Sequence, residues 1–409
     1  MLRLTLNIEV MRARIAIVVA CAVRAMPALA QTTPLTRDAA VAIALDRGAR
    51  LGVARADTAV ANAQLITARA LPNPVLSASY SKSLPNYHIT ADLPFDFPPV
   101  RSLRIRSAQL GLEAAQLRYR LAHATIVLDA DTTYTHAVAA REHLALTRRN
   151  ALDADSLLHM VERRRDLGDA SEMDVQLARV NAGQQENLAA ADSLTLVSSL
   201  LDLQAVLGFR SDELEVSATD SLGVPPEAAP PARATLSESA ANLSLQSAVA
   251  AARLQHRSLW SSPSLSLGVE YGDPSQTGLL PTFGIGIGLP LFDRNRGQIA
   301  QAEAERVRAA AELTLAQVEA RNEIAHGTRE RANAIARVGR DRALVVSANT
   351  VAAMALTAYR EGASALPNVL EAQRTARDVL GQYIDDLAAA WIATAELRVL
   401  ALTPTSVSP

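Results

Sequence analysis

The chain has 409 residues, of which 49% are hydrophobic but only 3% aromatic, and its formal net charge is −2. A composition so poor in aromatic residues favours long, closely packed helices over a bulky globular core. Without a basic patch interleaved with aromatic residues, a nucleic-acid partner is not expected.

The N-terminal segment has the layout of a secretory signal peptide. Two arginines precede an apolar run over residues 15–23, and the small-residue stretch Ala28-Leu29-Ala30 follows it. The apolar run is too short to span a bilayer as a mature helix. We therefore expect residues 1–30 to be a signal peptide that is cleaved after Ala30.

The single cysteine, Cys21, lies inside this segment. Because it follows Val18-Val19-Ala20, it also resembles a weak lipoprotein cleavage site, and lipidation of Cys21 is the alternative to cleavage after Ala30. Cys21 is otherwise a passive member of the apolar run. Cleavage after Ala30 leaves a mature chain without cysteine, and hence without a disulfide.

The mature chain contains an internal repeat. Residues 35–209 are predicted to run helix, strand, strand, helix, glycine break, helix, and residues 235–402 follow the same order. Between them a proline-rich stretch with little apolar patterning is typical of a linker. The predicted division is a first repeat at 31–216, a linker at 217–234, a second repeat at 235–402 and a tail at 403–409.

Each half carries one predicted strand pair, at about 74–83 and 88–97 and at about 263–272 and 282–292. Apolar side chains alternate there with polar residues or glycine. Strands of about ten residues with one apolar face are typical of lipid-spanning barrels. The side chains predicted to face lipid in the second pair are Leu265, Leu267, Val269, Phe283, Ile285, Ile287 and Leu289.

Strands in lipid must close into a barrel, because every backbone N–H and C=O needs a partner. Barrels of this kind need about eight strands or more, so four strands cannot close alone. A membrane location therefore requires an oligomer that pools its strands. The alternative is two amphipathic hairpins packed on helices in a soluble α+β protein; the secretory signal favours the barrel.

Long helical hairpins are predicted after the strands, at about 101–209 and 295–402. Apolar or small residues recur every seven positions in both, which indicates coiled-coil-like packing. The recurring residues are Leu112, Tyr119 and Ile126 in the first half and Ala302, Ala309 and Ala316 in the second.

A glycine interrupts each helical hairpin. Gly168 and Gly362 can adopt the left-handed conformation that ends a helix. After Gly168, Ser171 and Asp174 have the spacing of a capping box. Ser364 is expected to cap the equivalent helix of the second half.

Four segments in order within this duplicated frame resemble the outer-membrane efflux protein family, the TolC-like channels. They are "ARALPNPVLSASYS" (68–81), "RRDLGDASEMDVQLARV" (164–180), "GLPLFDRNRGQIAQAEAE" (288–305) and "AYREGASALPNVLEAQRT" (358–375). The stretch "ALPNPVLS" is also similar to the branch that serves heavy-metal cation pumps.

The resemblance implies a mostly α-helical fold with a transmembrane β-barrel. Three chains would share a 12-stranded barrel in the outer membrane, and their helices would form a coiled-coil tunnel through the periplasm. Such a channel passively conducts drugs, small organic solutes or heavy-metal cations, which an inner-membrane pump and a periplasmic adaptor deliver. It is not an enzyme and holds no cofactor or metal.

The resemblance also implies a gate and a docking surface at the hairpin tips. By position, Asp174 matches an acidic tie and Tyr359 a tyrosine that bonds to it. The chain departs from the family pattern where Ser364 replaces an arginine and Met173 replaces a hydroxyl residue. The predicted gate residues are Asp174, Tyr359, Ser364, Asn368 and Glu371, and the predicted adaptor-docking tips are Leu167, Gly168 and Gly362.

Two of these interpretations remain open. Asn368 and Glu371 match two acidic ring positions, but Asn368 is not acidic, and Glu371 is equally explained as a solvated helix residue. The other functional class is a soluble periplasmic coiled-coil adaptor or scaffold.

His136 and His143 lie seven residues apart without acid or cysteine companions in the sequence, so a metal site is not expected there.

Overall fold

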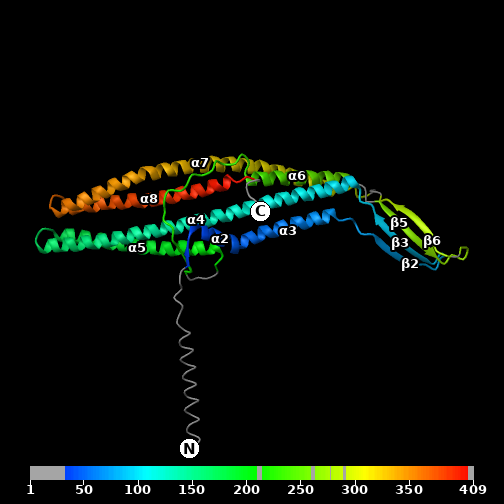
Figure 1. Cartoon of the computed structure of the whole chain (residues 1–409), viewed down its shortest axis with the longest axis horizontal. Helices are drawn as coiled ribbons and strands as arrows, with labels where there is room; N and C mark the ends of the chain where they lie inside the picture. The colour runs from blue at the N-terminus through cyan, green and yellow to red at the C-terminus, as the bar shows by residue number, and fades with distance from the viewer. Residues whose placement is uncertain (1–32, 210–213, 259–262, 277, 289–291, 404–409) are drawn as a thin grey trace, which may run out of the picture. The chain divides into compact units, whose positions relative to one another are not determined.

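The computed structural model describes residues 33–209, 214–258, 263–276, 278–288 and 292–403 (Figure 1). The predicted signal segment with Cys21, Ala28 and Ala30, and the predicted lipid-facing Leu289, lie outside the described residues. The strands are β1 (Thr33–Leu35), β2 (Val75–Tyr80), β3 (Tyr87–Pro94), β4 (Val216–Ala218), β5 (Ser264–Tyr271) and β6 (Leu280–Gly286). The helices are α2 (Arg37–Arg47), α3 (Ala49–Arg69), α4 (Pro98–Asp166), α5 (Glu172–Leu207), α6 (Leu236–Arg257), α7 (Arg296–Arg360) and α8 (Leu366–Leu400).

The described residues form two compact units that do not coincide with the two repeats. Each unit takes segments from both halves of the chain, because α4, α7 and α8 each contribute to both. Unit 1 contains residues 33–44, 133–223 and 344–388, and unit 2 contains residues 45–132, 224–343 and 389–403.

Both predicted helical hairpins are present, and a glycine in the left-handed region lies at each turn. Gly168 has φ 86° and Gly362 has φ 76°. Non-glycine residues adopt such angles at a cost of roughly 1–2 kcal/mol. Helix α8 begins at Leu366, and the hydroxyl of Ser364 accepts a hydrogen bond from the Asn368 side chain at 3.2 Å. The structure therefore shows no capping of the α8 backbone by Ser364.

The core of unit 1 lies where the two hairpins meet. Seven buried side chains from all four hairpin helices pack together there. Long helices with narrow apolar stripes gain most of their stability from such burial, since propensity alone is marginal. The buried residues are Leu157 and Val161 from α4, Val175 and Ala178 from α5, Tyr359 from α7, and Leu366 and Val369 from α8.

In unit 2, small residues let α4 and α6 approach closely. A Cβ added to Gly111 would lie 3.6 Å from the Ser247 hydroxyl oxygen. The hydroxyls of Ser107 and Ser247 each donate to the other residue's carbonyl, at 3.1 and 2.9 Å. About three turns away along the same two helices, Leu117 and Leu236 are buried in one apolar cluster. Small and hydroxyl side chains thus hold helices from the two halves together.

The strands of unit 2 form one antiparallel sheet in the order β2-β3-β5-β6. Both strand pairs are present; each strand is shorter than the predicted one, and β3 and β6 begin one and two residues earlier. The β3–β5 pairing, with Leu93 opposite Leu265 and Tyr87 opposite Tyr271, joins the strands of the two halves. Because β2 and β6 each have only one neighbour, both edges of the sheet lack a strand partner within the described chain.

A second, two-stranded sheet in unit 1 was not predicted. β1 pairs with β4 in parallel, so part of the predicted linker is a short strand. The hydroxyl oxygen of the buried Tyr134 of α4 lies 2.8 Å from the Leu35 carbonyl oxygen and 3.0 Å from Asp220 Oδ2, and its single hydrogen can be donated to either acceptor. Burial raises the pKa of Tyr134 above its usual value, so the hydroxyl stays protonated and keeps donating.

Candidate functional site

One face of the four-stranded sheet is apolar and exposed. The register places Leu265 opposite Ile285 and Leu267 opposite Phe283, with all four side chains on the same face. Phe283 and Ile285 are 79% and 75% exposed. Val269 follows in the same alternation on β5, and Ile287, just beyond β6, is also exposed. A run of uncovered apolar side chains of this kind is typical of a lipid-facing surface.

The opposite face of the sheet carries polar side chains and glycine. His88 and Glu270 form a cross-strand pair at 3.2 Å, and the Ser266 hydroxyl donates to the Asp92 carboxylate. A Cβ at Gly268 would approach the Ile89 carbonyl oxygen to 3.0 Å, so this position has no room for a side chain. The two faces therefore differ as the sequence predicted.

Aromatic residues gather at both ends of the sheet strands. Tyr87 lies between Tyr80 and Tyr271, with ring centroids 5.2 and 6.3 Å away. After the opposite end of β3, Phe95 and Phe97 make an edge-to-face contact at 5.4 Å. Aromatic girdles at the two lipid–water interfaces are typical of transmembrane barrels.

The helical tips contain an arginine–tyrosine contact that sequence reasoning missed. Arg164 of α4 lies over the ring of Tyr359 of α7, with its guanidinium carbon 4.8 Å from the centroid. The same guanidinium donates a hydrogen bond to the Tyr359 carbonyl. Tyr359 is 5% exposed, and burial raises the pKa of its hydroxyl. This contact joins the first hairpin to the second.

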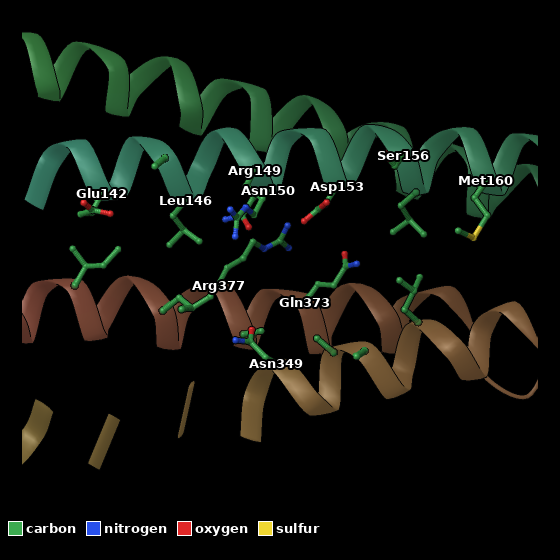
Figure 2. Close-up of a pocket in the computed structure, with 18 of the residues that line it drawn as sticks. Glu142, Leu146, Arg149, Asn150, Asp153, Ser156, Met160, Asn349, Gln373 and Arg377 are labelled. Carbon is green, nitrogen blue, oxygen red and sulfur yellow. The ribbon is translucent and has the colours of Figure 1, made fainter. Parts of the chain in front are cut away.

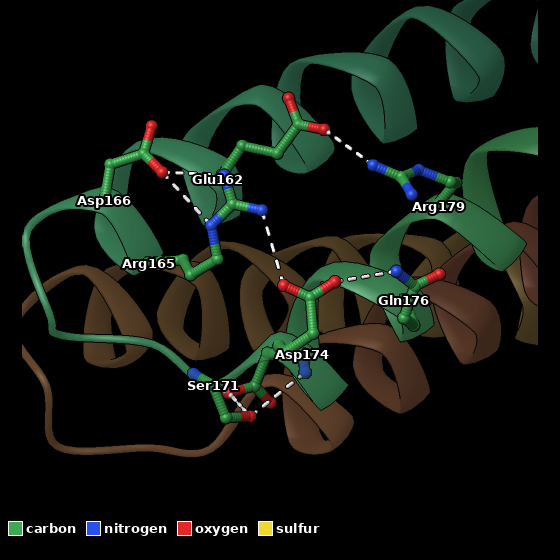
Figure 3. Close-up of polar contacts among 8 residues, drawn as sticks. Glu162, Arg165, Asp166, Ser171, Asp174, Gln176 and Arg179 are labelled. Carbon is green, nitrogen blue, oxygen red and sulfur yellow. Dashed lines mark hydrogen bonds and ion pairs between the residues drawn. The ribbon is translucent and has the colours of Figure 1, made fainter.

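Within the described single chain, no hydrogen bond joins Asp174 to Tyr359, so the tie implied by the resemblance stays a prediction for the assembled channel. Tyr359 Oη is buried without a hydrogen-bond partner among the described residues. Asp174 instead completes the predicted capping box: its carboxylate accepts from the Ser171 backbone N–H at 3.1 Å, and its own N–H donates to Ser171 Oγ at 3.1 Å (Figure 3). Within the described chain Asp174 thus stabilises the start of α5, and Arg164 contacts Tyr359.

Ion pairs surround the turn between α4 and α5 (Figure 3). Arg165 contacts Asp166 at 2.6 Å and Glu172 at 3.4 Å, while Arg179 contacts Glu162 at 3.2 Å. Hydrogen bonds from Gln176 and Arg165 lower the pKa of Glu172, which keeps the first turn of α5 negatively charged.

The expected docking residues lie at the turns. Leu167 is 79% exposed, and Gly168 and Gly362 are also exposed. Met173, at the first turn of α5, is 68% exposed. These tips present small and apolar groups to solvent.

Glu371 is already paired within its own helix. The Arg374 guanidinium donates to both oxygens of the Glu371 carboxylate, at 3.0 and 2.8 Å, and also contacts Asp378 at 3.3 Å. These hydrogen bonds lower the pKa of Glu371 below its usual range. A ring of Glu371 side chains would therefore carry less net negative charge than the acid alone suggests. The spacing of three residues between Glu371 and Arg374 is a signal that could have shown this pair.

The two histidines noted in the sequence lie on α4. His143 contacts Asp385 of α8 at 2.8 Å, a long-range partner that the sequence does not reveal. His136 lines the same small cavity as His143 and Asp385. No group of three or more histidine, cysteine or acidic side chains in the described parts of the chain is arranged to hold a metal ion.

Comparison with known proteins identifies the family. The chain matches the family described as Outer membrane efflux protein over residues 40–209 and 236–401. It is 24% identical over 277 residues to the cobalt-zinc-cadmium resistance protein CzcC of Cupriavidus metallidurans, a match that spans 66% of each chain and so just under two thirds of the relative's length.

Solved structures share the fold at low identity. The outer membrane channel CmeC of Campylobacter jejuni superposes with a TM-score of 0.76 at 15% identity, over 91% of this chain and 87% of that chain. The outer membrane protein VceC of Vibrio cholerae superposes with a TM-score of 0.73 at 18% identity, over 89% of this chain and 96% of that chain.

The comparisons agree with the exposed apolar face, the open sheet edges and the paired helical hairpins. They favour a TolC-like channel in the outer membrane, with its helical part in the periplasm, over a soluble adaptor. The chain belongs to the outer membrane efflux protein family.

Proposed function

We propose that three copies of the chain form the passive outer-membrane channel of a tripartite efflux system. The observation that carries this proposal is the four-stranded sheet with two unpaired edges and one exposed apolar face. In lipid, β2 of one copy must pair with β6 of another, because unpaired backbone groups there are costly. Three copies supply twelve strands, enough to close a barrel.

Helix α5 supports assembly through the helical region as well. By length and composition it is apolar enough to cross a membrane, yet only 22% of its most apolar window is buried. Val180, Leu188 and Leu194 are 59%, 51% and 71% exposed. In the proposed trimer these side chains would be covered by a neighbouring copy, which explains an apolar face on a periplasmic helix.

The substrate class we propose is heavy-metal cations. The support is the similarity to CzcC, a cobalt-zinc-cadmium resistance protein, together with the stretch "ALPNPVLS". The channel would conduct solutes that an inner-membrane pump and a periplasmic adaptor deliver, without catalysis.

The gate we propose lies at the hairpin tips and is held by Arg164 and Tyr359. Closing requires the first and second hairpins to stay together, and the Arg164 guanidinium contacts both the ring and the carbonyl of Tyr359. Asp174 stabilises the helix start beside this contact, and Glu371 and Asn368 would lie around the mouth. The exposed Leu167, Gly168 and Gly362 would contact the adaptor, because glycine allows close backbone approach.

One experiment tests the channel assignment. The full chain is expressed in a double-membraned bacterium, extracted from the outer membrane with detergent and imaged as single particles. A threefold hollow cylinder is expected. A soluble periplasmic monomer or dimer, obtained without detergent, would instead support the adaptor or scaffold alternative.

The docking surface is tested separately by Gly362→Glu. The variant should still form trimers in the outer membrane but should abolish metal resistance in a strain that depends on this channel. Normal resistance with Gly362→Glu would rule out this tip as the adaptor contact.

A further inference from the structure

A cavity of 730 Å³ with a mixed polar and apolar lining lies within unit 1, between α4 on one side and α7 and α8 on the other. Five charged side chains line it: Glu142, Arg149, Asp153, Arg360 and Arg377. Amides from all three helices add hydrogen-bonding groups, namely Asn150, Asn349 and Gln373. The cavity therefore brings charged and amide groups from the two hairpins together among apolar side chains.

Two arginines from facing walls point into the same part of this cavity. Figure 2 shows Arg149 of α4 and Arg377 of α8 converging beside Asn150. Among the described residues, neither guanidinium has a hydrogen-bond or ion-pair partner. Arg377 is half-buried, and this burial lowers the pKa of its guanidinium. Arg374 adds a further positive charge beside Arg377, while Asp378 and Asp153 act in the opposite direction. Burial of a cation without a hydrogen-bonded partner is costly.

The acidic side chains of the cavity offset this charge only in part. Glu142 is already bound to Arg141 at 2.8 Å. Asp153, the other lining acid, forms no ion pair within the described chain, although its charge favours the protonated form of Arg377. Three arginines thus line the cavity, and Asp153 is the one lining carboxylate without an ion-pair partner in the described chain. The cavity therefore has an excess of positive charge.

We propose that this cavity binds a multivalent oxyanion of the phosphate class between Arg149 and Arg377. The planar guanidinium fork donates paired N–H groups that match the oxygens of phosphate or sulfate, and two forks from opposite walls favour an ion with several oxygens over chloride. A free oxyanion is favoured over an acidic side chain of a partner protein, because Arg377 lies half-buried between helices of the same chain.

A bound oxyanion would tie the first hairpin to the second through α4 and α8. It would add to the Arg164–Tyr359 contact and stabilise the arrangement in which the hairpins lie together. This consequence for gating rests on the proposed function, whereas the binding itself does not.

The test measures binding directly on the full chain in detergent. Inorganic phosphate, sulfate and chloride are titrated by calorimetry at constant ionic strength, and thermal unfolding is followed in parallel. Phosphate and sulfate should bind saturably and raise Tm, and chloride should do neither. Arg377→Gln and Arg149→Gln should each weaken phosphate binding by about tenfold or more, because each removes a charge-assisted hydrogen-bonding group.

Arg148→Gln is the matched control. Arg148 neighbours Arg149 on α4 and is exposed like it, but Arg148 does not line the cavity, so its loss should leave phosphate binding unchanged. Arg377→Lys, which keeps the charge but loses the fork, should bind phosphate with intermediate affinity. Absence of saturable phosphate binding, or equal binding by wild type and Arg377→Gln, would overturn the proposal. So would binding of an acidic peptide but not of phosphate. None of these readouts depends on export.

Discussion

Arg164 and Tyr359 connect the two helical hairpins, although 195 residues separate them in the chain. The guanidinium covers the tyrosine ring at 4.8 Å and donates to the carbonyl of the same residue, while the tyrosine hydroxyl is left without a partner. The ring and backbone of Tyr359, and not its hydroxyl, therefore form the contact.

Two substitutions at this contact should have different effects on the channel. Arg164→Gln should raise the resting conductance of the channel in planar bilayers and lower stability by about 1–2 kcal/mol, because it removes a cation–π contact and a charge-assisted hydrogen bond. Tyr359→Phe should leave the resting conductance unchanged. A leaky Tyr359→Phe channel would show that the hydroxyl closes the gate after all.

The faces of the sheet predict where a charge blocks assembly. Ile285→Arg should prevent formation of heat-sensitive oligomers on gels, since a cation near the bilayer midplane costs about 2–4 kcal/mol per copy. Gly284→Arg is the matched control, because Gly284 is adjacent and exposed on the other face, and an added Cβ would lie 3.5 Å from Ser266. Equal assembly of the two variants would contradict the assignment of faces.

The pairing of Glu371 with Arg374 predicts the ion selectivity of the mouth. Arg374→Gln should increase cation preference by about two- to threefold in bilayer recordings, because it releases the charge of Glu371 in a constricted pore. Glu371→Gln should decrease cation preference.

Glu312→Gln is the control for this prediction. Glu312 forms a comparable helical pair with Arg308 at 2.8 Å on α7, but at no position matched to the gate. Its substitution should change selectivity little. Unaltered selectivity in both Glu371→Gln and Arg374→Gln would show that the two residues form a surface ion pair with no role in ion selectivity.

The capping box predicts a local stability effect. Ser171→Ala should lower stability by about 1 kcal/mol and speed hydrogen exchange at the Asp174 amide, which loses its acceptor. Ser156→Ala should leave stability unchanged, because the Ser156 hydroxyl only donates a hydrogen bond to the Leu152 carbonyl one turn earlier in α4. Equal exchange at Asp174 in both variants would show that the cap contributes nothing.

Much of the local structure followed from the sequence. The period-two alternation predicted which side chains share a face of the sheet, and Gly168 and Gly362 predicted the two helical turns. The Ser171–Asp174 spacing predicted the capping box. These features depend on residues close together in the chain, whose spacing sets their geometry through backbone sterics and short-range hydrogen bonds.

Only the tertiary structure decided which distant segments meet. The β3–β5 pairing, the pairing of β1 with β4 at the start of the predicted linker and the choice of Arg164 as the partner of Tyr359 all join residues from distant parts of the chain. Sequence spacing does not encode these contacts. They depend on how whole helices and strands pack, and Asp174 shows the consequence, because one of its carboxylate oxygens binds at the start of α5 while the Tyr359 hydroxyl has no partner among the described residues.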